Sequence, residues 1–109
     1  MKQASRAAIE AGIVVKSLDR LIHEDVKVAY EAFALVSLLI AADETDVVFD
    51  AIENHRDERI KFALLHILKV SRDPRILTKL NELRTRSSFP TEMADRMREV
   101  VASVEQVTA

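Results

Sequence analysis

Apolar residues recur every three to four positions along almost the whole chain, which is the spacing of one face of an α-helix. This periodicity predicts six helical segments: residues 4–22, 25–42, 44–54, 57–71, 74–85 and 90–106. The run from Ala32 to Ala42 is apolar on nearly every side, so we expect other helices to flank that segment. The pattern therefore predicts an all-α fold.

Polar residues mark the starts of several predicted helices. Asp43 can cap the third helix, with Asp46 at the position of a capping-box acid, and Asp57 can cap the fourth. Asp73-Pro74 is the clearest boundary, because Asp suits the N-cap and the missing N–H of Pro has no intrahelical partner in the first turn. We expect Asp73 to accept a backbone N–H from the first residues of the fifth helix.

The apolar faces of the last three helices predict the core. The fourth and fifth helices should bury these side chains: Leu64, Ile67, Leu68, Leu77 and Leu80. The last helix, with Pro90 in its first turn, carries one stripe: Met93, Met97, Val100, Val101 and Val104. Each stripe is wide enough to pack against a neighbouring helix, so we expect a single core.

Two parts of the chain correspond at an offset of 32 residues. His23-Glu24-Asp25-Val26-Lys27-Val28 matches His55-Arg56-Asp57-Glu58-Arg59-Ile60. Each unit would be a helix, a turn and a second helix, and such a pair exposes an apolar face until a neighbour stacks on it. The repeat predicts one domain over residues 1–109, a short α-solenoid of about six antiparallel helices. Its parts would be a half repeat 4–22, repeats 23–54 and 55–86, and a capping helix 88–107.

The segment from Asp57 to Leu83 also has the motifs of a known repeat. An Asp, a β-branched residue and a base open its first helix, Asp73-Pro74-Arg75 follows, and leucines then recur at Leu77, Leu80 and Leu83. In these features it resembles a HEAT repeat of the bacterial, phycobilisome-lyase-like kind. The resemblance is close over about half the chain, while residues 23–54 match loosely. It implies HEAT-like stacking in which second helices line a concave surface, and it transfers no catalytic residue.

Composition narrows the choice of fold and compartment. The chain has 109 residues, with 49% apolar and 31% charged, and only one Gly and two Pro, too few for the turns of an all-β domain. Cysteine is absent, which excludes disulfides, thiolate metal sites and Cys nucleophiles and fits a reducing cytoplasm. The longest weakly polar run has 11 residues, too few to span a bilayer. We expect a cytoplasmic protein with no membrane association.

Catalytic chemistry finds little support in the sequence. It has no Gly-rich phosphate loop, no nucleophile elbow and no HExxH metal motif. His23 and His55 occupy equivalent positions and are interpreted as turn residues, and His66 should make one structural hydrogen bond. We therefore expect no enzymatic activity, no cofactor and no metal.

Charged residues form two stripes that suggest a binding surface. Asp46, Asp50 and Glu53 share one helix face, and the equivalent helix of the next repeat carries Arg75, Lys79, Glu82 and Arg86. By the resemblance, the two stripes would lie side by side on the concave surface. One interpretation is a groove that binds a protein segment of mixed charge. The other is a set of inter-helix salt bridges, which contribute only about 0–1 kcal/mol each.

Three functions follow from these patterns. We favour a small protein-interaction module or adaptor that binds through a groove formed by residues 13–21, 46–54 and 75–86. The alternative is a nucleic-acid-associated protein that uses the basic second repeat, because residues 55–86 carry nine bases and four acids. Eight of those bases could contact phosphates: Arg56, Arg59, Lys69, Arg72, Arg75, Lys79, Arg84 and Arg86. A homodimer is the third hypothesis, since a short stack leaves two ends that can associate.

Overall fold

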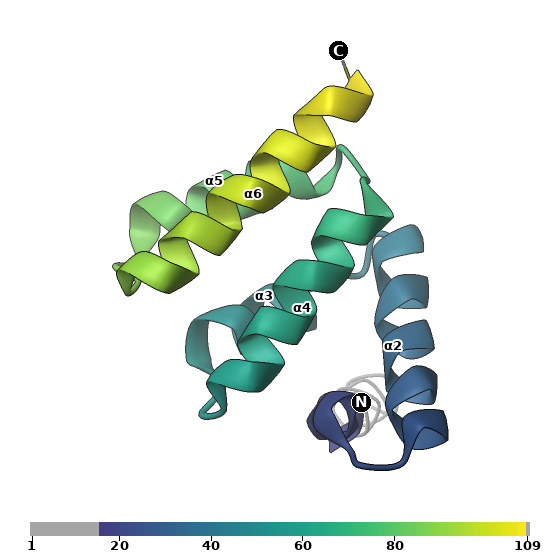
Figure 1. Cartoon of the computed structure of the whole chain (residues 1–109). Helices are drawn as coiled ribbons and strands as arrows, with labels where there is room; N and C mark the ends of the chain where they lie inside the picture. Colours follow the sequence, from purple (N-terminus) through teal and green to yellow (C-terminus); the bar gives the residue numbers. More distant parts are fainter. Residues whose placement is uncertain (1–15, 109) are drawn as a thin grey trace, which may run out of the picture.

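The structure, a computed structural model, describes residues 16–108 and is shown in Figure 1. In that range the elements are the 3-10 helix η1 (Asp19–Ile22) and five α-helices, α2 (Val26–Ala41), α3 (Asp46–Asn54), α4 (Glu58–Ser71), α5 (Ile76–Arg86) and α6 (Thr91–Thr108). These residues contain no β-strand, so the predicted all-α class is confirmed. The bounds of α2 to α6 lie within two residues of the predicted ones. Of the predicted helix 4–22, residues 16–22 are described and are helical, with an α-helical turn at 16–18 followed by η1, and the rest lies outside the described part. No described helix is long and apolar enough to cross a membrane.

The helices form two stacked layers. In Figure 1, α4 and α6 lie in front of α3 and α5, and α2 lies beside α4 at one end. Contacts join α2 to α4 and α4 to α6 in the front layer, and α3 to α5 in the rear layer. Across the layers, α3 packs on α4, α5 packs on α6, and η1 packs on both α2 and α4. This stacking of successive helix pairs is the organisation of a helical-repeat fold.

One cluster of buried apolar side chains runs through the stack. The centre of this cluster is α4, which has neighbours in both layers. It therefore buries Leu65 in addition to the predicted core residues of this helix, Leu64, Ile67 and Leu68. Four of the five predicted core residues of α4 and α5 are buried, whereas Leu77 is half-buried. That prediction is wrong for Leu77 because α5 belongs to the last helix pair and leaves one flank uncovered. The α6 stripe is buried apart from Val101, which is half-buried.

Aspartates cap the turns where the sequence predicts them. The carboxylates of Asp57 and Asp73 accept the backbone N–H two residues later, at 2.9 Å and 3.0 Å. Asp25 caps α2 in the same way at 2.9 Å, which the correspondence with Asp57 could have predicted. Pro90 stands just before α6, and its carbonyl accepts the N–H of Ala94, so it is not inside the first turn.

The predicted cap at Asp43 is wrong. Asp43 has a left-handed φ of 58°, and its N–H donates to the carbonyl of Ile40, so it ends α2 instead of starting α3. Thr45 precedes α3 without a side-chain capping bond, and its hydroxyl instead accepts a hydrogen bond from Lys79. Arg72 ends α4 in the same left-handed conformation, with φ 51°. Glycine usually takes such positions, and neither is glycine here.

Candidate functional site

Side chains of α3 and α5 line a groove of about 270 Å³. Phe49 and Leu83, which are buried core residues, supply its apolar part. Six of the seven predicted site residues line it: Asp46, Asp50, Glu53, Lys79, Glu82 and Arg86. The structure therefore brings the two charged stripes together, as the 32-residue offset predicts. We refer to this feature as the α3–α5 groove.

Lys79 ties the start of α3 to α5. Its Nζ donates to the Thr45 hydroxyl at 2.9 Å and lies 3.3 Å from Oδ1 of Asp46. Thr45 is buried, so this hydrogen bond satisfies a hydroxyl that water does not reach. The Asp46 side chain is almost fully exposed, and its ion pair with Lys79 therefore contributes little stability.

Glu53 joins the end of α3 to the end of α5. Its carboxylate oxygens lie 3.3 Å from Nε and from Nη2 of Arg86, and it accepts a hydrogen bond from the Ser87 hydroxyl. The Ser87 hydroxyl and then the Arg86 guanidinium hold the pKa of the Glu53 carboxyl below its usual value. The salt bridges expected between the stripes are therefore present at both ends of the groove.

Within the described part of the chain, two carboxylates of the groove have no cationic partner. Asp50 accepts a hydrogen bond from Nδ2 of Asn54 at 2.9 Å, which leaves its charge uncompensated. The Glu82 side chain has no hydrogen bond or ion pair within residues 16–108. Four carboxylates and two cations line the groove, for a formal charge of −2. The groove is therefore acidic once its internal pairs are made.

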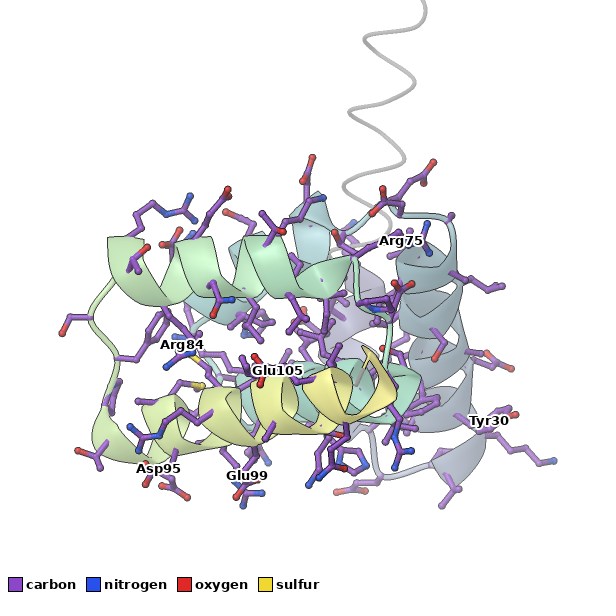
Figure 2. The ribbon with its side chains drawn as sticks, turned by 90° about the horizontal axis from the view of Figure 1, so that it is seen from above. Tyr30, Arg75, Arg84, Asp95, Glu99 and Glu105 are labelled. Carbon is purple, nitrogen blue, oxygen red and sulfur yellow. The ribbon has the colours of Figure 1, made fainter. Side chains whose placement is uncertain are left out.

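Arg75 does not belong to the groove, and its placement on that face is wrong. It precedes α5, and its Nη2 donates to the carbonyls of Ile40 and Ala41 at 3.3 Å and 3.0 Å. Figure 2 shows Arg75 over that end of α2. The guanidinium also lies 2.7 Å from Asp73 and holds the pKa of that carboxyl below its usual value. Arg75 thus neutralises the carbonyl end of α2, where a cation is favourable.

The two histidine turns have the same hydrogen bonds. Nδ1 of His23 accepts the N–H of Asp25, and Nδ1 of His55 accepts the N–H of Asp57, both at 2.9 Å. The interpretation of both histidines as turn residues is confirmed. Because Nδ1 of His55 is an acceptor, Nε2 carries the proton of the neutral ring and donates to Asp19 at 2.8 Å.

His66 lies on α4, away from the two histidine turns. His66 is exposed and makes no hydrogen bond within the described residues, so the predicted structural bond is wrong. It lies on the outer side of α4, where water can solvate both ring nitrogens. In residues 16–108, no group of three His, Asp or Glu side chains could hold a metal ion.

Most of the basic residues considered for nucleic-acid binding are already paired with carboxylates. Five of the eight are in ion pairs: Arg59, Lys69, Arg75, Lys79 and Arg86. Arg84 donates to the side-chain carbonyl of Asn81 at 3.3 Å and extends between α5 and α6 in Figure 2. The positive charge of residues 55–86 is therefore dispersed and largely neutralised by neighbours.

Two further hollows have no strong signal in the sequence. One, of about 450 Å³, lies between α5 and the start of α6 and is lined by Arg84 and Phe89. The other, of about 380 Å³, is apolar and lies between η1, α2 and α4. In the sequence, Phe89 in the connector before Pro90 could have indicated the first hollow. The second hollow could not be predicted, because the sequence does not show which apolar positions of α2 stay exposed.

Comparison with protein-family models, curated proteins and solved structures finds no match to this chain. The resemblance of residues 57–83 to HEAT repeats therefore stays a prediction from their motifs.

Proposed function

We propose that the protein is a small interaction module that binds a basic segment of a partner protein in the α3–α5 groove. The observation that carries the proposal is the pair of groove carboxylates, Asp50 and Glu82, that have no cationic partner in the described part of the chain. Lys or Arg side chains of a ligand would supply the missing charge, and their aliphatic stems would cover the apolar part. The sequence predicts a ligand of mixed charge, and the formal charge of −2 in the groove favours a ligand with net positive charge.

The groove also has the rigidity that a binding surface needs. Its walls are two helices of the stack, joined at one end by the hydrogen bond from Lys79 to buried Thr45 and at the other by the contact of Arg86 with Glu53. Helical-repeat proteins commonly bind extended segments along such aligned helices. As parts of the same proposal, the protein acts as an adaptor without catalysis, and it acts in the cytoplasm, in keeping with its lack of cysteine.

A peptide-display library panned on the immobilised full chain tests the proposal. We expect enriched peptides to carry net positive charge and to lose binding to Asp50→Lys with Glu82→Lys. The matched control is Glu24→Lys with Glu92→Lys, which makes the same charge change at exposed positions outside the groove. The control should keep the affinity, apart from a modest slowing of association by the altered net charge. Equal binding to both double variants would contradict the groove assignment.

A heparin column separates this proposal from the nucleic-acid alternative. We expect the wild-type chain to flow through at low salt, because five of its eight candidate phosphate-binding bases are paired with carboxylates and the groove is acidic. Retention that falls steeply with salt would indicate counterion release from a polyanion and would support nucleic-acid binding instead. Lys79→Glu with Arg86→Glu should then abolish that retention, with circular dichroism confirming that the helices remain.

A further inference from the structure

The cavity between α5 and the start of α6 has the size and the lining of a small-molecule pocket. Its volume of about 450 Å³ lies within the range of about 300–1,000 Å³ that is usual for such pockets. Phe89, Ala94 and Met97 form its apolar part. Met97 is buried and Phe89 packs against the core, so the fold holds this part in place. We call this cavity the α5–α6 pocket.

The α5–α6 pocket lies on a different side of α5 from the α3–α5 groove. Asn81, Arg84 and Thr85 line the pocket, whereas the intervening residues Glu82 and Leu83 line the groove. Because a helix turns once in about 3.6 residues, these two sets belong to different faces of α5. A molecule in the pocket therefore leaves the groove free, and the two sites can be tested separately.

The polar edge of the pocket carries one positive charge. Arg84 is the single ionisable side chain among the described residues that line it, and Figure 2 shows it between α5 and α6. Its Nη1 donates to Oδ1 of Asn81 at 3.3 Å, and it has no ion pair within residues 16–108. Since an arginine only donates, this contact turns the carbonyl oxygen of Asn81 toward the guanidinium. The amide N–H groups of Asn81 stay available to a ligand.

The hydroxyl protons beside the pocket already have acceptors. The Thr85 hydroxyl donates to backbone carbonyls of its own helix at 2.9 Å and 3.2 Å, and the Ser87 hydroxyl donates to Glu53, which lines the groove. The N–H groups of Arg84 and Asn81 are therefore the donors that a bound molecule meets. No carboxylate of residues 16–108 lines the pocket, so an anionic group meets no like charge on its walls.

We propose that the α5–α6 pocket binds a small monocarboxylic acid with an aromatic body. The guanidinium of Arg84 holds the carboxylate in the paired geometry that these two groups prefer, and the amide of Asn81 donates to the same oxygen atoms. The aromatic body lies against the Phe89 ring and the Met97 thioether, both of which interact favourably with aromatic rings. The small side chain of Ala94 leaves room for it.

A nuclear magnetic resonance titration of the full chain with 3-phenylpropionate tests the proposal. The matched probe is 3-phenylpropanamide, which has nearly the same shape and no charge. We expect the amide signals of Phe89, Ala94 and Met97 to shift and to saturate with a dissociation constant of about 5 mM or lower. The uncharged probe should bind at least about tenfold more weakly, because it cannot form an ion pair with Arg84. No saturable shift at these residues up to about 20 mM acid, or equal affinity for both probes, would overturn the proposal.

Two variants locate the ligand. Arg84→Gln removes the charge and should weaken binding of the acid at least about tenfold, while binding of the uncharged probe changes little. Ala94→Leu fills the pocket and should abolish binding of both probes, with circular dichroism confirming that the helices remain. The matched control Arg20→Gln removes an exposed arginine on η1, outside the pocket, and should leave the dissociation constant within about twofold. Wild-type affinity in Arg84→Gln, or an equal loss in Arg20→Gln, would contradict the assignment of the carboxylate to Arg84.

Discussion

Leu64→Ala is expected to be the most damaging single truncation of an apolar side chain in α4. Leu64 is 0% exposed, and α4 contacts η1, α2, α3 and α6, so helices on several sides hold the site open. Removing three buried carbon atoms loses about 2 kcal/mol of transfer free energy, and the cavity that remains adds to this loss. We therefore expect the free energy of unfolding to fall by about 3–5 kcal/mol.

Urea unfolding followed by circular dichroism measures this loss. With an m-value of about 1.5 kcal/mol/M, the midpoint of Leu64→Ala should fall by roughly 2–3 M. Val70→Ala is the matched control, because it truncates an apolar residue on the same helix that is 55% exposed. Its effect should stay within about 0.5 kcal/mol. If Leu64→Ala lowers the free energy of unfolding by no more than the control does, Leu64 is not at the centre of the core.

Three further predictions concern the ends of helices. Asp73→Ala should lower the free energy of unfolding by about 1 kcal/mol in urea titrations, since it removes the capping bond to the N–H of Arg75, and an unchanged midpoint would contradict this. Hydrogen bonds from Arg59 and Arg75 hold the pKa values of Asp57 and Asp73 below the usual 3.8, so stability should be full above about pH 5 and decrease as the pH falls below about 4. Asp73→Asn, which can still cap, should lose less stability as the pH falls. An equally steep loss would show that protonation of Asp73 does not cause the pH dependence. Arg72→Gly should raise the free energy of unfolding by up to about 1 kcal/mol in thermal unfolding, because it relieves the left-handed conformation at φ 51°, and a lower melting temperature would refute that cause.

The features predicted correctly from the sequence depend on neighbouring residues. The Asp57 and Asp73-Pro74 boundaries follow from capping chemistry within one turn, and the α4 and α6 cores follow from periodicity over a few turns. The adjacency of the stripes on α3 and α5 follows from the repeat, although the observed ion pairs join residues 33 apart instead of 32. A correspondence between repeats thus identifies which helix faces meet. Which individual residues form ion pairs depends on the length and direction of their side chains.

The incorrect predictions depend on backbone conformation and on long side chains. Asp43 fits an N-cap by residue type, yet it takes the left-handed position that ends α2 in a chain with a single glycine. Arg75 belongs to the basic stripe by spacing, but its guanidinium reaches carbonyls on α2 from a residue that precedes α5. Neither the sign of φ at one residue nor the direction of a long guanidinium side chain is determined by the pattern of residue types.

The central position of α4 has a consequence for the exchange of amide hydrogens. α4 packs against η1, α2, α3 and α6, so its amides can open to solvent only when most of the stack comes apart. α5 packs mainly on α3 and α6. Deuterium should therefore enter α5 through partial opening, while the middle of α4 exchanges only at the rate of global unfolding. The slowest amides of the chain thus report its total stability, and they lie in one helix of 14 residues.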